Sequence, residues 1–75
     1  MIEYSVWTST RGSVQKFKDP RKAFDWARSE VYTEDDPAEV IALLEDGFNV
    51  EWQYGFAAVN IWPEEVKFFP QQWWS

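Results

Sequence analysis

Cysteine and histidine are both absent from this 75-residue sequence. Without cysteine, the chain can form neither a disulfide nor a thiolate zinc site, so it differs from the disulfide-rich scaffolds of secreted proteins. Without histidine, it lacks the commonest general base and the commonest metal ligand. A G-x-S-x-G nucleophile motif is also missing. These absences predict a cytoplasmic protein that is not an enzyme and that holds no cofactor and no metal.

Long hydrophobic runs are absent too. The longest stretch without a charged residue is Trp52 to Pro63, which is far shorter than the roughly 20 apolar residues that cross a bilayer. The first residues alternate between apolar and polar side chains and do not have the pattern of a signal peptide. We therefore expect a protein that does not contact a membrane.

Charge is unevenly distributed along the chain, whose net charge is −6. Residues 11–28 contain six of the seven basic side chains, whereas residues 29–75 contain ten acidic ones and only Lys67 as a base. A negative net charge repels phosphate backbones, so direct binding to nucleic acid is not expected. The separation of the two signs predicts a molecule with one basic and one acidic side.

Alternating apolar residues predict two hairpins, one near each end of the chain. Residues 2–6 alternate between apolar and polar side chains, and a polar turn leads from them into a second strand at 14–18. Residues 48–54 show the clearest alternation, and residues 56–62 form their partner strand, which Pro63 ends.

Two Asp-Pro pairs predict helix starts, because Asp accepts from free amide groups there and proline lacks a donor that would be unpaired anyway. Asp19-Pro20 predicts a helix over about 20–32, and Asp36-Pro37 predicts a second over about 37–46. The alternative for residues 39–46 is a strand that turns through an Asp-Gly pair.

Together these elements predict one α+β domain over residues 1–75. It would have a four-stranded, mostly antiparallel sheet in ββααββ order, with both helices on one face. Residues 63–75 would form an aromatic C-terminal tail that packs on the body or on a partner. The expected core residues are Tyr4, Phe24, Phe48, Val50 and Trp52, with Ala57, Val59 and Ile61 facing the helices.

Aromatic side chains are unusually frequent, with six Trp, six Phe and three Tyr. Aliphatic residues already fill much of so small a core, so some rings are expected at the surface. Tryptophan is among the side chains that most often dominate binding energy at protein interfaces. The predicted aromatic binding residues are the tryptophans outside the best core positions: Trp7, Trp26, Trp62, Trp73 and Trp74.

Acidic side chains gather between residues 30 and 51. They lack the spacing and the glycine of an EF-hand loop, so helix capping explains several of them better than a metal site does. As a group they predict an electronegative surface that complements a basic partner. The predicted acidic binding residues are Glu30, Glu34, Asp35, Asp36, Glu39, Glu45, Asp46 and Glu51.

These features predict a small acidic protein-binding module that inhibits or modulates a larger host enzyme or nucleic-acid-handling machine. Its partner would be a larger protein with a basic nucleic-acid-binding groove. In size, acidity and lack of cysteine and histidine, the chain resembles the small proteins that bacteriophages and other mobile elements make to block host enzymes. One alternative is a homo-oligomeric structural or assembly protein that uses exposed tryptophans, and another is a single-stranded nucleic-acid binder through residues 11–28. Composition is compatible with a monomer and with a homodimer.

Overall fold

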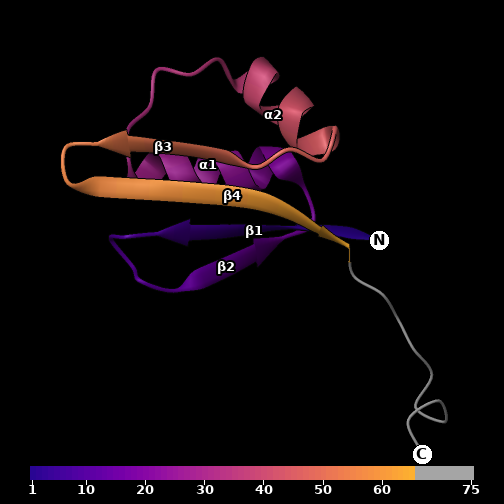
Figure 1. Cartoon of the computed structure of the whole chain (residues 1–75), viewed down its shortest axis with the longest axis horizontal. Coiled ribbons are helices and arrows are strands. Elements are labelled where there is room, and N and C mark those ends of the chain that lie inside the picture. The colour runs from indigo at the N-terminus through magenta and orange to yellow at the C-terminus, as the bar shows by residue number, and fades with distance from the viewer. Residues whose placement is uncertain (66–75) are drawn as a thin grey trace, which may run out of the picture.

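The computed structural model describes residues 1–65, in which four strands form one antiparallel sheet in the order β2-β1-β4-β3 (Figure 1). Both helices fall between the two hairpins in the chain, so the predicted α+β class and the ββααββ order are confirmed. Neither helix of the described residues is long and apolar enough to cross a membrane. The elements are β1 (Ile2–Thr8), β2 (Val14–Phe17), α1 (Pro20–Glu30), α2 (Pro37–Glu45), β3 (Val50–Tyr54) and β4 (Ala57–Glu65).

The core lies between the sheet and the two helices. Val6 and Ile61 of the sheet meet Phe24 of α1 and Leu44 of α2, and all four side chains are fully buried. The Phe24 ring packs edge-on against the ring of Trp52, with centroids 5.6 Å apart. Four of the five expected core residues lie in or against this core, and so do Ala57, Val59 and Ile61.

Helix α1 starts where the sequence predicts and ends earlier. The Asp19 side chain accepts from the backbone amide of Arg21 at 2.8 Å, which is the expected cap. The predicted end at residue 32 is wrong, because Val31 has extended backbone angles and turns its side chain into the core. The carbonyl of Val31 then accepts from the indole Nε1 of Trp52 at 3.1 Å.

Residues 37–45 are helical, so the strand alternative for this segment is wrong. Gly47 has a φ of 94°, and its amide donates to the carbonyl of Leu44. The amide of Phe48 donates to the carbonyl of Leu43, which completes a Schellman motif. Because Phe48 takes part in this cap, β3 begins only at Val50, and the prediction of Phe48 as a core residue is wrong: its side chain is 58% exposed.

The last strand continues past Pro63, where we expected it to end. β4 pairs with β1 as far as Glu65, whereas its ladder with β3 stops at Ile61. Pro63 therefore lies where β4 has a neighbour on one side only, and proline is tolerated at such an edge position. Residues 63–65, assigned above to the tail, are part of the sheet, and the rest of the predicted tail lies outside the described residues.

Candidate binding surface

The face of the sheet opposite the helices is not covered by any element within residues 1–65. Trp7 of β1, Asn60 of β4 and Glu51 of β3 lie side by side in one row across this face, because Asn60 is the register partner of both neighbours. Alternation along each strand points all three side chains away from the core. A strand of the first hairpin and both strands of the second thus contribute to one polar and aromatic row.

This row forms part of an open hollow of about 520 Å³. The small side chain of Ala58, in the next row, leaves room between Trp7 on one side and Glu51 and Gln53 on the other. We call this site the open-face hollow. Trp52 and Val59 also line it, and the residues whose side chains face away from the core are Trp7, Glu51, Gln53, Ala58 and Asn60.

One polar atom of the open-face hollow lacks a partner. The Oδ1 atom of Asn60 is buried and accepts no hydrogen bond from residues 1–65. Buried polar groups are normally satisfied, so this acceptor is an exception. Because the atom is covered, a ligand can donate to it only if the asparagine side chain turns outward.

The other end of the open face is already paired internally. Lys16 of β2 forms an ion pair of 3.0 Å with Glu64 of β4, and the indole Nε1 of Trp62 donates to the same carboxylate at 3.1 Å. The hydrogen bond from Lys16 is the largest cause that lowers the pKa of Glu64 below its usual value. Trp62 is therefore half-buried and engaged, while Trp7 in the adjacent row presents an exposed ring.

A second aromatic group lies at the turn between β3 and β4. Phe56 is fully exposed in this turn, and the rings of Tyr32 and Tyr54 meet edge-on with centroids 5.2 Å apart. Both tyrosines remain more than half exposed. We call Tyr32, Tyr54 and Phe56 the hairpin-tip cluster.

Acidic charge and the open-face hollow both adjoin the hairpin-tip cluster. The negative charge of Glu34 is the largest cause that raises the pKa of Tyr32. Gln53 lines the open-face hollow and also a smaller depression beside Tyr32 and Tyr54. The sequence analysis missed this cluster, although the triplet Tyr54-Gly55-Phe56 was a signal: glycine in a tight turn leaves its neighbours at the tip.

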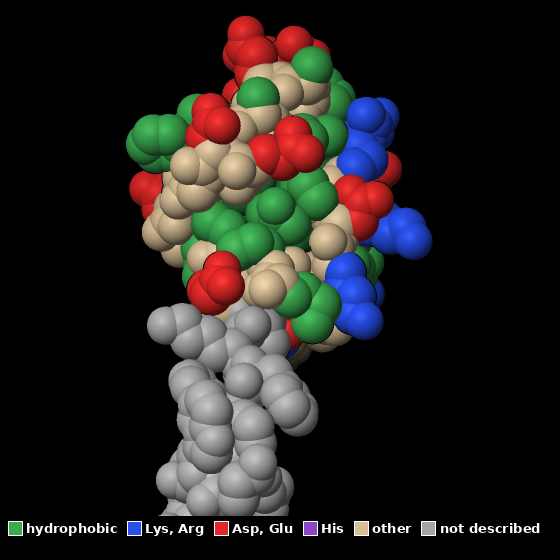
Figure 2. All heavy atoms as spheres, turned by 90° about the vertical axis from the view of Figure 1, so that its right-hand side faces the viewer, with side chains coloured by type: hydrophobic (Ala, Val, Ile, Leu, Met, Phe, Trp, Pro, Cys, Tyr) green, Lys and Arg blue, Asp and Glu red, His purple; other side chains and the backbone are tan. Residues whose placement is uncertain are grey.

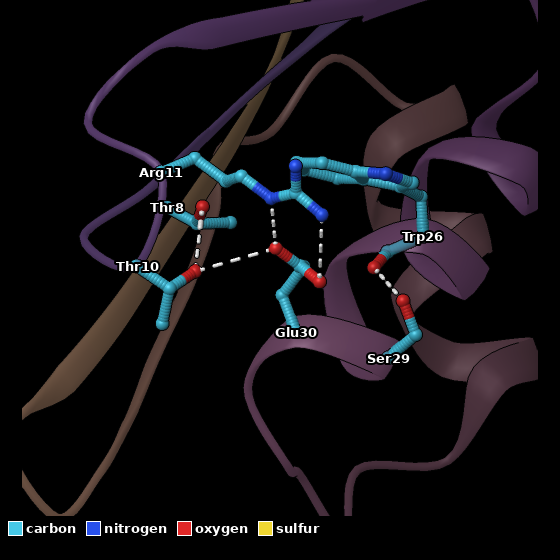
Figure 3. A network of polar contacts seen from close by, with 6 residues as sticks. All are labelled: Thr8, Thr10, Arg11, Trp26, Ser29 and Glu30. Carbon is cyan, nitrogen blue, oxygen red and sulfur yellow. Dashed lines mark hydrogen bonds and ion pairs between the residues drawn. The ribbon is translucent and has the colours of Figure 1, made fainter.

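Trp26, a predicted binding residue, is instead part of an internal contact (Figure 3). Its ring packs against Phe17, and the guanidinium of Arg11 lies over it at 5.9 Å from the ring centroid. The same guanidinium donates to the carboxylate of Glu30, and this hydrogen bond is the largest cause that lowers the pKa of Glu30. The Arg11 cradle is our name for the ring of Trp26, the carboxylate of Glu30 and the guanidinium between them.

The predicted acidic residues do not converge on one site. Glu30 is engaged with Arg11, and the carboxylate of Asp36 caps α2 by accepting from Ala38. Within residues 1–65, no three acidic side chains are placed to hold a metal ion. The remaining acidic residues lie before and along α2 and on β3: Glu34, Asp35, Glu39, Glu45, Asp46 and Glu51. Of the predicted aromatic residues, Trp73 and Trp74 lie outside the described part of the chain.

Basic side chains gather along one side of the molecule (Figure 2). Most of them are paired: Arg11 with Glu30, Lys16 with Glu64, and both Arg21 and Arg28 with Asp25. These ion pairs do not favour nucleic-acid binding by residues 11–28, because the neighbouring carboxylates offset much of their charge.

The chain contains one S-x-x-K spacing, from Ser13 to Lys16. This spacing serves a serine nucleophile when a helix brings both side chains together. Here Lys16 lies on a strand, on which side chains three positions apart point to opposite faces, and its amine is paired with Glu64. The Ser13–Lys16 spacing therefore does not provide an activated serine.

Comparison with protein-family models, curated proteins and solved structures finds no match to this chain. The open-face hollow and the hairpin-tip cluster share Gln53, so together they make a continuous surface of exposed rings, amides and a carboxylate. Such a surface is suited to binding another protein.

Proposed function

We propose that this chain is a cytoplasmic, non-catalytic protein-binding module that inhibits or modulates a larger protein with a basic surface, such as a nucleic-acid-handling machine. The observation that carries the proposal is the hairpin-tip cluster, in which a fully exposed Phe56 stands beside two exposed tyrosines. Exposed aromatic groups of this kind mark interaction surfaces, and such rings often supply the energetically dominant contacts.

Charge supports the same proposal. Glu34 and Asp35 lie exposed next to the hairpin-tip cluster, and the whole chain carries a net charge of −6. An acidic rim around apolar rings complements a basic surface that surrounds an apolar pocket. The small proteins of mobile elements that block host enzymes remain the proposed class for this module.

The test is capture of a partner from a lysate of the source organism by the intact chain and by two variants. Phe56→Ser removes the most exposed ring, whereas Leu43→Ser on α2 removes an exposed apolar side chain from a helix that contributes nothing to the open face of the sheet. We expect the intact chain and Leu43→Ser to retain the same protein, and Phe56→Ser to retain at least about tenfold less, as for an interface hot spot. Because Phe56 contributes nothing to the core, the melting temperature of Phe56→Ser should stay unchanged.

Equal capture by Phe56→Ser and the intact chain would contradict the proposal. So would sedimentation as a dimer or larger assembly that Phe56→Ser converts to a monomer, since the tip would then bind a second copy of this chain. That second result would favour the alternative of a homo-oligomeric assembly protein.

A further inference from the structure

The Arg11 cradle and the open-face hollow present the same two kinds of side chain. In the cradle, the ring of Trp26 and the carboxylate of Glu30 hold a guanidinium between them (Figure 3). In the hollow, Trp7 and Glu51 stand on either side of Asn60. Within residues 1–65, neither of these two forms an ion pair or a cation–π contact.

The spacing of the strands sets the width of the hollow. Trp7 and Glu51 are separated by one intervening strand, so their backbones lie about 10 Å apart. Asn60, between them, has a shorter side chain than either neighbour and forms the floor. The gap between ring and carboxylate is therefore suited to one flat group that lies above the asparagine.

The polar atoms of the hollow call for a ligand that donates hydrogen bonds. The carboxylate of Glu51 only accepts when ionised, and the Oδ1 atom of Asn60 has no donor within the described residues. A guanidinium is flat, carries five N–H donors and no acceptor, and stacks on aromatic faces. A phosphate-bearing ligand would instead meet the carboxylate and the negative net charge.

We propose that the open-face hollow binds an arginine side chain, with the guanidinium stacked on Trp7, hydrogen-bonded to Glu51 and lying above Asn60. We expect this arginine to come from a basic segment of the partner protein, and only this expectation rests on the function proposed above. The hollow then determines which basic partners bind, while the hairpin-tip cluster supplies apolar contact.

The experiment is a titration of the ¹⁵N-labelled full chain with Nα-acetyl-arginine amide, followed through backbone and indole N–H signals. Nα-acetyl-citrulline amide has the same shape without the charge, and Nα-acetyl-lysine amide has the charge without the flat fork. We expect arginine to shift the indole signal of Trp7 and the side-chain amide signal of Asn60, with half-saturation in the millimolar range. Citrulline and lysine should bind at least about fivefold more weakly, the factor expected from losing cation–π contact or bidentate hydrogen bonding.

Two variants with the same change in charge separate the hollow from general attraction of cations. Glu51→Gln removes the carboxylate of the hollow, and Glu39→Gln removes an exposed carboxylate in the first turn of α2. Glu51→Gln should weaken arginine binding about fivefold, whereas Glu39→Gln should leave it within about twofold. Equal effects of the two variants, or equal binding of arginine and citrulline, would overturn the inference.

Neutral and phosphate-bearing probes give the remaining outcomes. If methyl glucoside or adenosine monophosphate shifts Trp7 at lower concentration than arginine does, the hollow is a sugar or nucleotide site and the inference fails. If arginine does not bind but Phe56-dependent capture persists, the inference fails and the proposed function stands. If arginine binds as expected but no protein is captured, the hollow is supported and the proposed function fails.

Discussion

Trp52 and Trp7 show that one type of side chain has opposite environments in this small protein. Trp52 packs on Phe24, and its indole N–H donates to the carbonyl of Val31. Val31 is the residue at which the chain leaves α1. Trp7 points to the uncovered face of the sheet and makes no aromatic pair within residues 1–65. The hydrophobic alternation of β3 predicted that Trp52 faces the core. The alternation of β1 did not predict which residues surround Trp7.

The substitution Trp52→Phe tests this difference. It should lower the free energy of unfolding by about 1–2 kcal/mol, because the carbonyl of Val31 loses its donor and packing against Phe24 is reduced. Trp7→Phe is the matched control and should change stability by less than about 0.5 kcal/mol. Urea unfolding followed by circular dichroism measures both, and a loss for Trp7→Phe as large as that for Trp52→Phe would contradict this assignment.

Helix α2 depends on the Schellman motif at its C-terminus, in which Gly47 adopts a φ of 94°. Apart from the adjacent residues, no atom lies within 4 Å of a Cβ added there, so Gly47→Ala tests backbone conformation alone. Gly47→Ala should destabilise the protein by about 1 kcal/mol, because alanine disfavours this region. Gly47→Asn should cost less, because asparagine tolerates the left-handed region better, and equal thermal unfolding of the two variants would show that φ is not the cause.

Local chemistry predicted the helices better than the strand ends. Each helix begins at an Asp-Pro pair, and Gly47 correctly indicated the end of α2, because caps are encoded by adjacent residues. The prediction that Pro63 ends the strand was wrong because its effect depends on whether β3 reaches that far along β4, which is a property of the whole sheet. The prediction of Phe48 as a core residue was wrong for a similar reason. Its hydrophobicity fitted the strand, but its backbone amide donates to the helix cap.

At the scale of the whole molecule, two ion pairs connect parts that are distant in the sequence. Arg11 joins the β1–β2 turn to Glu30 of α1, and Lys16 joins β2 to Glu64 across β1. Hydrogen bonds from the two bases lower the pKa of both carboxyl groups below the usual 4.5. Each pair therefore stabilises the fold above that value, and the contribution is lost as the pH falls through the lowered pKa.

We expect Glu30→Gln and Glu64→Gln each to lower the melting temperature at pH 7, because each removes the charged partner of a base. The difference from the unsubstituted chain should shrink as the pH falls through the lowered pKa of each carboxyl group, where the native carboxylates become protonated as well. Glu51→Gln is the control, because Glu51 forms no ion pair within residues 1–65, and it should show little difference at any pH. Thermal unfolding at a series of pH values from 7 downward measures the effect, and a difference that persists undiminished to the lowest pH at which the chain still folds would contradict it.

The candidate site was less predictable than the fold. Composition indicated exposed rings and an acidic surface, and the alternation of β1 and β4 placed Trp7 and Trp62 away from the core. Alternation gives the face of a side chain but not its neighbour on the next strand, so the row of Trp7, Asn60 and Glu51 was invisible. The internal contact of Trp26 depends on Arg11 from the turn between β1 and β2, which no local pattern reveals.

This row of three strands also limits how the chain can change in length. One residue inserted within β4 before Asn60 would turn the asparagine toward the helices and bring Ile61 to the open face, because side chains alternate with a period of two. The same insertion in the turn at residues 9–13 would leave the row intact. Relatives of this protein that keep the hollow should therefore vary in loop length and share the spacing within β1, β3 and β4.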